Sequence, residues 1–161
     1  MIATGASDGT VHLWRPAGGE AMMRVAVPAS AAVSATAFGG NDLAVGDAAG
    51  NVGVYVLPAR SWVWPIQSQA QPITAVAVDG ANGMVASASS LNDKSTIEIS
   101  SAVAHARSAQ ITVAPVLGSP ITRLAFNGAN RLVVGAFTGQ VFVFSLRPTL
   151  RFAIARKTSR A

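Results

Sequence analysis

The chain has 161 residues, the length of a single domain, and 50% of them are hydrophobic while only 12% are charged. This composition excludes a disordered protein, and the lack of cysteine excludes disulfides, thiolate metal sites and cysteine nucleophiles. The net charge of +5 comes from the last fifteen residues, because residues 1–146 hold seven basic and seven acidic side chains. Such a neutral body creates no broad field that would attract nucleic acid.

No run of the roughly 20 apolar residues that a transmembrane helix needs is present. Met1 is followed by no basic segment, and Asp8 falls where a signal peptide would have its apolar core. We therefore expect no membrane span and no secretion signal, and we predict an intracellular protein, either cytoplasmic or nuclear.

The first predicted element is a hairpin in residues 2–14 (IATGASDGTVHLW). Two short alternating segments flank Asp8 and Gly9, and an Asp-Gly pair in this position is a strong signal for a type I′ turn. The hairpin ends on an aromatic residue, Trp14, and a further strand is predicted at residues 21–27.

The same hairpin pattern returns three times along the chain. Residues 43–55 and 131–144 repeat its apolar, glycine and aromatic positions, with Gly50 and Gly139 at the corner of the turn. Residues 83–100 form the other copy, in which extra residues predict a longer turn. The last positions of the four hairpins are therefore equivalent, at spacings of 41, 45 and 44 residues: Trp14, Tyr55, Ser100 and Phe144.

A short alternating strand precedes each later hairpin, and another strand follows it. The preceding strands are predicted at residues 33–38, 72–78 and 120–126, and the last two of these begin with Pro-Ile-Thr. The following strands are predicted at residues 61–67, 110–116 and 150–155. Units of four strands that repeat every 41 to 48 residues, with no helical period, are typical of β-propeller blades.

Residues 2–14 resemble the WD40 repeat, in which two strands of a blade turn through Asp-Gly and end on tryptophan. Asp8 matches the turn aspartate of the family, Trp14 its tryptophan and Thr4 its strand hydroxyl. In the family these side chains form hydrogen bonds with the histidine of a Gly-His pair, which braces the blade. This chain has no Gly-His pair, and the later hairpins lack the aspartate and the tryptophan at the corresponding positions. The resemblance implies an all-β fold, a partial WD40-like β-propeller built from four-stranded antiparallel blades, with Trp14 buried.

The predicted blades cover residues 1–30, 31–71, 72–118 and 119–155, and residues 156–161 form a basic tail. The first unit lacks one strand, so the chain amounts to about three and a half blades, whereas propellers close with about four to eight. Two explanations stay open: the chain is a fragment of a longer propeller, or it completes its ring with another chain. We favour the fragment, because repeat arrays rarely begin in the middle of a unit.

Few side chains are candidates for chemistry. We expect His12 to be a surface or inter-blade histidine, and His105 has no partner at metal-ligand spacing. Asp47 interrupts an apolar strand end and is expected to form a strand-end or turn hydrogen bond. The acidic residues are scattered and give no paired carboxylates. We therefore predict that the protein is not an enzyme, with no catalytic, cofactor-binding or metal site and no small-molecule substrate.

Two features are candidate partner contacts. Trp62 and Trp64 alternate in an outer strand and so share a face, where they either anchor a partner or pack under a neighbouring blade or loop; we favour packing. Arg156, Lys157 and Arg160 lie in the tail, which is a solvated chain end, a link to a missing blade, or an electrostatic contact with RNA or an acidic partner.

The function that the resemblance implies is a scaffold for protein–protein interaction, with other proteins as partners. One of these partners could be a chain or a missing segment that completes the propeller. The alternative is a WD40-like component of an RNA-containing or ribosome-assembly particle, which would use the basic tail.

Overall fold

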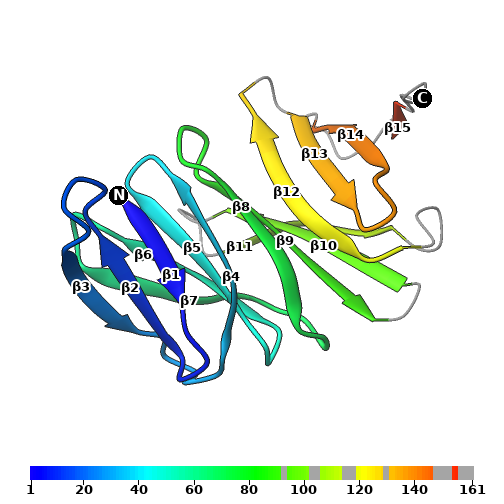
Figure 1. The fold of residues 1–161 in the computed structure, drawn as a ribbon. Helices are drawn as coiled ribbons and strands as arrows, with labels where there is room; N and C mark the ends of the chain where they lie inside the picture. Colours follow the sequence, from blue (N-terminus) through cyan, green and yellow to red (C-terminus); the bar gives the residue numbers. More distant parts are fainter. Residues whose placement is uncertain (92–93, 102–105, 114–118, 129–130, 147–153, 156–161) are drawn as a thin grey trace.

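The computed structural model describes residues 1–91, 94–101, 106–113, 119–128, 131–146 and 154–155. These residues form fifteen β-strands in four antiparallel sheets that follow one another along the chain. The sheets stand side by side in an arc (Figure 1), and we name them blades 1 to 4. The described part of the chain holds no helix that is long and apolar enough to cross a membrane. The prediction of an all-β fold built from small antiparallel sheets is confirmed.

Blade 1 has three strands and each later blade has four, always hydrogen-bonded in chain order. The strands of blades 1 and 2 are β1 (Ile2–Gly5), β2 (Thr10–Trp14), β3 (Ala21–Ala26), β4 (Val33–Gly39), β5 (Asp42–Asp47), β6 (Asn51–Val56) and β7 (Ser61–Ser68). The strands of blades 3 and 4 are β8 (Ile73–Asp79), β9 (Met84–Leu91), β10 (Lys94–Ser101), β11 (Ala106–Val113), β12 (Ile121–Asn127), β13 (Arg131–Ala136), β14 (Val141–Ser145) and β15 (Ile154–Ala155). The first strand of each four-stranded blade lies at the inside of the arc, where β4 and β12 both flank β8 (Figure 1).

The strand register confirms the alignment of the repeats. In every blade, the residue that ends the predicted hairpin pairs with the same position of the preceding strand: Trp14 with Ile2, Tyr55 with Leu43, Ser100 with Val85 and Phe144 with Leu132. The four different residues at this position therefore occupy equivalent places in their blades.

The third hairpin differs from its prediction. β9 and β10 have 8 residues each, and Leu91 pairs with Lys94, so only two residues connect the strands. The extra residues therefore belong to the two strands, which stay paired as far as Leu91 and Lys94, and do not lengthen the turn. The next strand, Ala106–Val113, begins earlier in the chain than the predicted 110–116. Of the predicted last strand, only Ile154–Ala155 belongs to the described residues.

The hairpin turns of blades 1, 2 and 4 share a geometry that differs from the predicted type I′ turn. In blade 1 the Gly9 N–H donates a hydrogen bond to the Ala6 carbonyl (3.3 Å), and the Ala6 N–H donates to the Thr10 carbonyl (2.9 Å). Gly9 has a φ of 76°, whereas Asp8 has no positive φ. This is a three-residue loop that ends on a left-handed residue, a common alternative in hairpins. The glycines that end the equivalent turns also have positive φ: Gly50 (90°) and Gly139 (81°).

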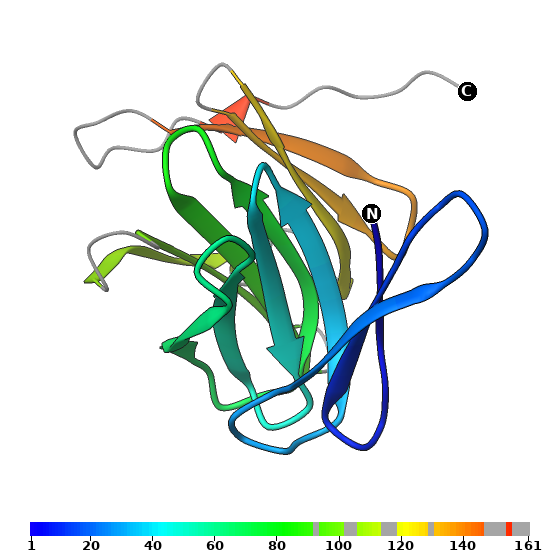
Figure 2. The ribbon, with the colours of Figure 1, turned by 90° about the vertical axis from the view of Figure 1, so that its left-hand side faces the viewer.

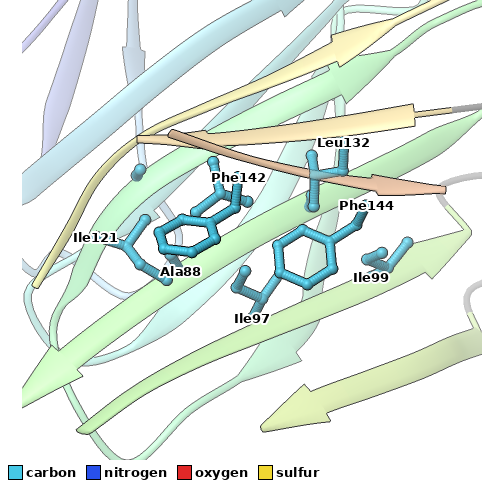
Figure 3. Packing of buried hydrophobic residues seen from close by; sticks show 10 residues of the cluster. Ala88, Ile97, Ile99, Ile121, Leu132, Phe142 and Phe144 are labelled. Atoms are coloured by element: carbon cyan, nitrogen blue, oxygen red, sulfur yellow. The ribbon is translucent and has the colours of Figure 1, made fainter. Parts of the chain in front are cut away.

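The hydrophobic core is divided into three clusters, each between two consecutive blades. Because successive side chains of a strand point to opposite faces, one strand contributes to two clusters. In β5, Leu43 and Val45 belong to the cluster between blades 1 and 2, whereas Ala44 belongs to the cluster between blades 2 and 3. Figure 3 shows the cluster between blades 3 and 4, which includes Ile97, Ile99, Leu132, Phe142 and Phe144. The blades are therefore held together by the mutual burial of their faces.

The two end faces of the arc stay uncovered within the described residues. Ile2 and Met22 in blade 1 are 50% and 49% exposed, and Val141 in blade 4 is 53% exposed. Figure 2 views the arc from the side of blade 1, whose strands (blue) lie in front of the other blades. A further blade at either end would cover such side chains, as the inner blades cover one another.

Candidate functional site

The inner strands β4, β8 and β12 line the candidate functional site. They lie side by side along the inside of the arc and form an open groove with a volume of about 340 Å³. The groove is lined by residues 34–37 of β4, residues 74–76 of β8 and residues 122–124 of β12. Three segments that are far apart in the sequence thus contribute equivalent residues to one surface.

Each inner strand contains a register shift at the same position, and a residue with a hydroxyl group occupies it: Ser34, Thr74 and Thr122. Each hydroxyl donates a hydrogen bond to a carbonyl of the adjacent strand: Ser34 Oγ to Gly46 (3.2 Å), Thr74 Oγ1 to Ala88 (3.3 Å) and Thr122 Oγ1 to Gly135 (3.4 Å). Such a bulge bends the strand and changes the direction of its side chains. Because each hydroxyl hydrogen is used in its bond, the oxygen offers only lone pairs to the groove. The groove therefore has three acceptor oxygens at equivalent positions.

Arg123 is the one charged residue among those that line the groove. It is exposed, and its Nη1 donates a hydrogen bond to the Thr122 carbonyl (2.7 Å), which ties the side chain to the bulge. No carboxylate lies among the lining residues of the described chain, so the positive charge is not neutralised within the groove. Most of the other lining side chains are small or aliphatic, such as Ala35, Ala37 and Val76. The groove combines one cation, the three hydroxyls at the bulges, a further hydroxyl on Thr36, and small apolar walls.

The groove was not predicted from the sequence. The signal that could have found it is the repeated Pro-Ile-Thr, whose threonines are Thr74 and Thr122, together with Ser34 at the equivalent position. The repeat indicates that these residues share a structural role. Only the packing of the blades brings them to a common surface.

Trp14 and Thr4, two of the positions that match the WD40 repeat, contact each other directly in blade 1. Trp14 Nε1 donates a hydrogen bond to Thr4 Oγ1 (2.8 Å), and the indole stacks against the His12 ring, with 5.8 Å between the centroids. Trp14 and His12 are only half-buried, because their face of blade 1 has no neighbouring blade in the described structure. The expectation that Trp14 is buried is therefore wrong, since the burial of a blade face needs a second blade.

Asp8 accepts several hydrogen bonds in the hairpin turn of blade 1. Its Oδ1 accepts the Thr10 N–H (3.0 Å) and the Thr10 hydroxyl (2.6 Å), and its Oδ2 accepts a hydrogen bond from Arg24 Nη2 (3.1 Å). The Thr10 hydroxyl, with a smaller contribution from Arg24, lowers the pKa of Asp8 below its ordinary value of 3.8. The carboxylate thus braces the turn in its ionised form.

The lowered pKa of Asp8 predicts a pH-dependent contribution to stability. Because the folded carboxyl binds its proton less readily than the unfolded one, this contribution is complete above pH 3.8 and is lost as the pH falls through the lower, folded pKa. We expect the difference in Tm between the wild type and Asp8→Asn to be larger at about pH 6 than at about pH 2.5. Thr10→Val should raise the pKa of Asp8 toward 3.8 in an NMR titration. A Tm difference that does not change with pH would contradict this role.

Blade 2 supplies its turn carboxylate from a different position. Ala49 occupies the place of Asp8, and Asp47 lies two residues earlier and is completely buried. Asp47 Oδ1 accepts the N–H groups of Ala49 (2.9 Å) and Asn51 (2.8 Å), and its Oδ2 accepts Asn51 Nδ2 (3.1 Å). The predicted turn hydrogen bond of Asp47 is confirmed, and it extends to three donors that hold the turn closed.

Blade 3 replaces the contact between tryptophan and threonine by another polar contact. Ser87 occupies the position of Thr4, and Ser100 occupies that of Trp14. The buried Gln69, in the connection between β7 and β8, donates a hydrogen bond from Nε2 to Ser87 Oγ (2.6 Å). The sequence carries no signal for this contact, because it joins a connecting segment to a strand 18 residues away.

Trp62 and Trp64 pack between blades 1 and 2. Both are half-buried against the cluster between these blades, and the Trp62 ring centroid lies 5.2 Å from that of Tyr55 and 5.4 Å from that of Trp64. Trp62 Nε1 also donates a hydrogen bond to the Ala26 carbonyl of β3 (3.0 Å). This geometry corresponds to the favoured alternative, packing under a neighbouring blade. A contact of either ring with a partner stays a prediction.

The tail residues Arg156, Lys157 and Arg160 lie outside the described residues, and so does His105. The alternative function in an RNA-containing or ribosome-assembly particle depends on that tail and stays a prediction. Within the described ranges, no three side chains of histidine, aspartate or glutamate are close enough together to hold a metal ion.

Many solved structures are similar to the chain, among them two pairs of proteins. The chain is similar to U3-55K (TM-score 0.76, 15% identity) and to the WD40 repeats of RRP9 (TM-score 0.76, 14% identity). These matches cover 95% of this chain but 47% and 46% of those chains, so this chain spans just under half of their length. It is also similar to the computationally designed proteins Ika4 and Ika8, each with a TM-score of 0.68 and 24% identity. Those matches cover 90% and 94% of this chain, 84% of Ika4 and 45% of Ika8.

No protein-family model and no curated protein sequence matches the chain. At 24% identity or less, the structural similarity shows the fold alone. The similarity extends over nearly the whole chain and so includes the four antiparallel sheets. The chain therefore folds as part of a WD40-type β-propeller, with a first blade of three strands followed by three blades of four strands.

Proposed function

We propose that the protein is a non-catalytic interaction scaffold that binds a segment of a partner protein in the inner groove. Propellers hold their binding surfaces on a rigid frame, and this general use of the fold supports a binding role by analogy. The observation that carries the proposal is the alignment of three acceptor hydroxyls, on Ser34, Thr74 and Thr122, beside the cation Arg123.

The chemistry of the groove favours a polypeptide segment with an acidic side chain. A guanidinium group pairs with a carboxylate through two parallel hydrogen bonds, which determine position as well as charge. The hydroxyl oxygens accept N–H groups of the bound backbone, and the walls near Ala35 and Val76 accommodate small apolar side chains. A nucleic acid carries many phosphates, and the single arginine of the groove would neutralise little of that negative charge.

Peptide selection on the immobilised full chain tests this proposal. A library of random peptides displayed on phage is enriched on the wild-type protein, and the enriched peptides are synthesised with a fluorescent label. We expect these peptides to contain aspartate or glutamate. Arg123→Glu should bind them at least about tenfold more weakly, because the substitution replaces an attraction by a repulsion. A tenfold change in Kd corresponds to about 1.4 kcal/mol of binding free energy. Fluorescence anisotropy measures the Kd.

Arg131→Glu is the matched control for this experiment. Arg131 is also exposed and begins β13 of the same blade as Arg123, but it does not line the groove. The control has the same change of charge and should keep the Kd of the wild type. Equal weakening of both variants would indicate a general electrostatic attraction and would contradict a specific site at Arg123. Enriched peptides without acidic residues would contradict it as well.

A further inference from the structure

The face of blade 3 that packs against blade 2 carries a group of buried polar side chains. Ile97 and Ile99 of β10 belong to the cluster between blades 3 and 4. Because successive side chains alternate, Glu98 and Ser100 point to the opposite face, toward blade 2. Ser87 of β9 lies opposite Glu98 in the strand register, and all three polar side chains are buried. The group lies between two four-stranded blades, so its burial depends on neither end face of the arc.

Ser100 stands where the other blades have an aromatic ring. The residues at the equivalent position are Trp14, Tyr55 and Phe144. The cross-strand partner of Ser100 is Val85, which belongs to the cluster between blades 2 and 3, so the hydroxyl points into that interface. A serine side chain fills far less volume than a ring. The place therefore has room for a small additional group.

Two atoms of this group have no hydrogen-bond partner among the described residues. Gln69 is 8% exposed and donates from Nε2 to Ser87 Oγ (2.6 Å), but its Oε1 accepts no hydrogen bond. The hydroxyl of Ser100, which is completely buried, likewise makes none. Rotation of the Gln69 amide would exchange its oxygen and nitrogen and would again leave one of them unpaired. Buried polar atoms without a partner lose their hydration without compensation, so these two atoms indicate a bound group.

We propose that this place binds a buried water molecule, which bridges Gln69 and Ser100 across the interface between blades 2 and 3. The water accepts the O–H of Ser100 and donates one hydrogen to Gln69 Oε1. Its second hydrogen points to the carboxyl group of Glu98 on the same face of β10, which gives the three hydrogen bonds that are usual for a buried water. The bridge joins the connection between β7 and β8 to β10, so the water is part of the contact between the blades.

The chemistry of the two unpaired atoms favours water over an ion. Gln69 Oε1 needs a donor, and the Ser100 O–H needs an acceptor. A metal cation offers no lone pair to the hydroxyl hydrogen, and a simple anion offers no hydrogen to the amide oxygen. Water supplies both. This site is separate from the groove at Arg123, so the inference does not rest on the proposed function.

Ser100→Ala tests the bridge, because it removes the hydroxyl and little else. Removal of an unpaired buried hydroxyl should leave the Tm unchanged or raise it, whereas removal of a hydroxyl bonded to water should lower it. We expect a lower Tm. Gln69→Leu should lower it as well, and the double variant should lose less free energy of unfolding than the sum of the two single losses, because each substitution removes the same bridge.

Ser95→Ala is the matched control. Ser95 is also buried in β10, but it shares the face of Ile97 and Ile99. Its effect should add to that of Gln69→Leu without coupling.

Magnetic relaxation dispersion of the water oxygen detects the bound molecule directly, since it reports waters that stay in the protein longer than the protein takes to tumble. We expect Ser100→Ala and Gln69→Leu each to lose the contribution of one water molecule, whereas Ser95→Ala keeps it. Equal dispersion in the wild type and both variants would overturn the proposal. A Tm of Ser100→Ala at or above that of the wild type, or additive losses in the double variant, would overturn it too.

Discussion

Replacement of Ile97 by alanine is expected to lower the free energy of unfolding by about 2–5 kcal/mol. Ile97 is completely buried in β10, and Figure 3 shows it beside Phe144 in the cluster between blades 3 and 4. The loss combines the transfer free energy of the removed carbon atoms with the cavity that they leave in a packed cluster. Urea denaturation followed by circular dichroism measures the change.

Ile2→Ala is the control for the Ile97 prediction, because it makes the same chemical change at a side chain that is 50% exposed. We expect it to cost less than about 1 kcal/mol. A similar loss in both variants would contradict the packing of blade 3 against blade 4 through this cluster. The comparison therefore tests the burial of blade faces, on which the arc depends.

Replacement of Gly50 by alanine is expected to cost about 2–5 kcal/mol, because two penalties add at this position. Gly50 has a φ of 90°, which an L residue with a side chain adopts only with strain. A Cβ atom at Gly50 would also overlap the carbonyl oxygen of Gln69 and lie 2.8 Å from that of Gln71. These are backbone atoms of the segment that leads into blade 3, so they do not move away as a flexible side chain would.

Gly139→Ala separates the two penalties. Gly139 ends the equivalent turn of blade 4 with a φ of 81°, but a Cβ atom there would have nothing within 4 Å. Only the conformational penalty applies, and we expect a loss of about 1–2 kcal/mol. Urea denaturation of both variants gives the two free energies. Equal losses would mean that Gly50 does not support the connection between blades 2 and 3.

Much of the fold could be predicted because its signals are local. Strand alternation and turn residues act over a few positions, so the hairpins and the equivalence of Trp14, Tyr55, Ser100 and Phe144 followed from the sequence. The role of Asp47 could be predicted for the same reason, since its partners Ala49 and Asn51 lie within four residues. The incorrect details were also local, because the type I′ turn and the longer third turn are close alternatives to the geometry that forms.

The candidate site could not be predicted, because its residues meet only after the blades pack. Arg123 carries no motif, and its place beside Thr74 depends on the position of β12 next to β8. The contact between Gln69 and Ser87 likewise joins residues far apart in the sequence, since it links the connection between β7 and β8 to β9. The alternation of Trp62 and Trp64 fits either an exposed or a packed face of the strand. The position of blade 1 beside them makes this face a packed one.

The sequence by itself therefore determined that the chain forms repeated hairpins and which of their positions are equivalent, because side-chain alternation and turn chemistry act between residues close along the chain. Only the tertiary structure decided which faces are buried and which hydroxyls line the groove. These properties belong to the arrangement of whole blades, since a blade face or a strand edge is covered only by another element of the structure.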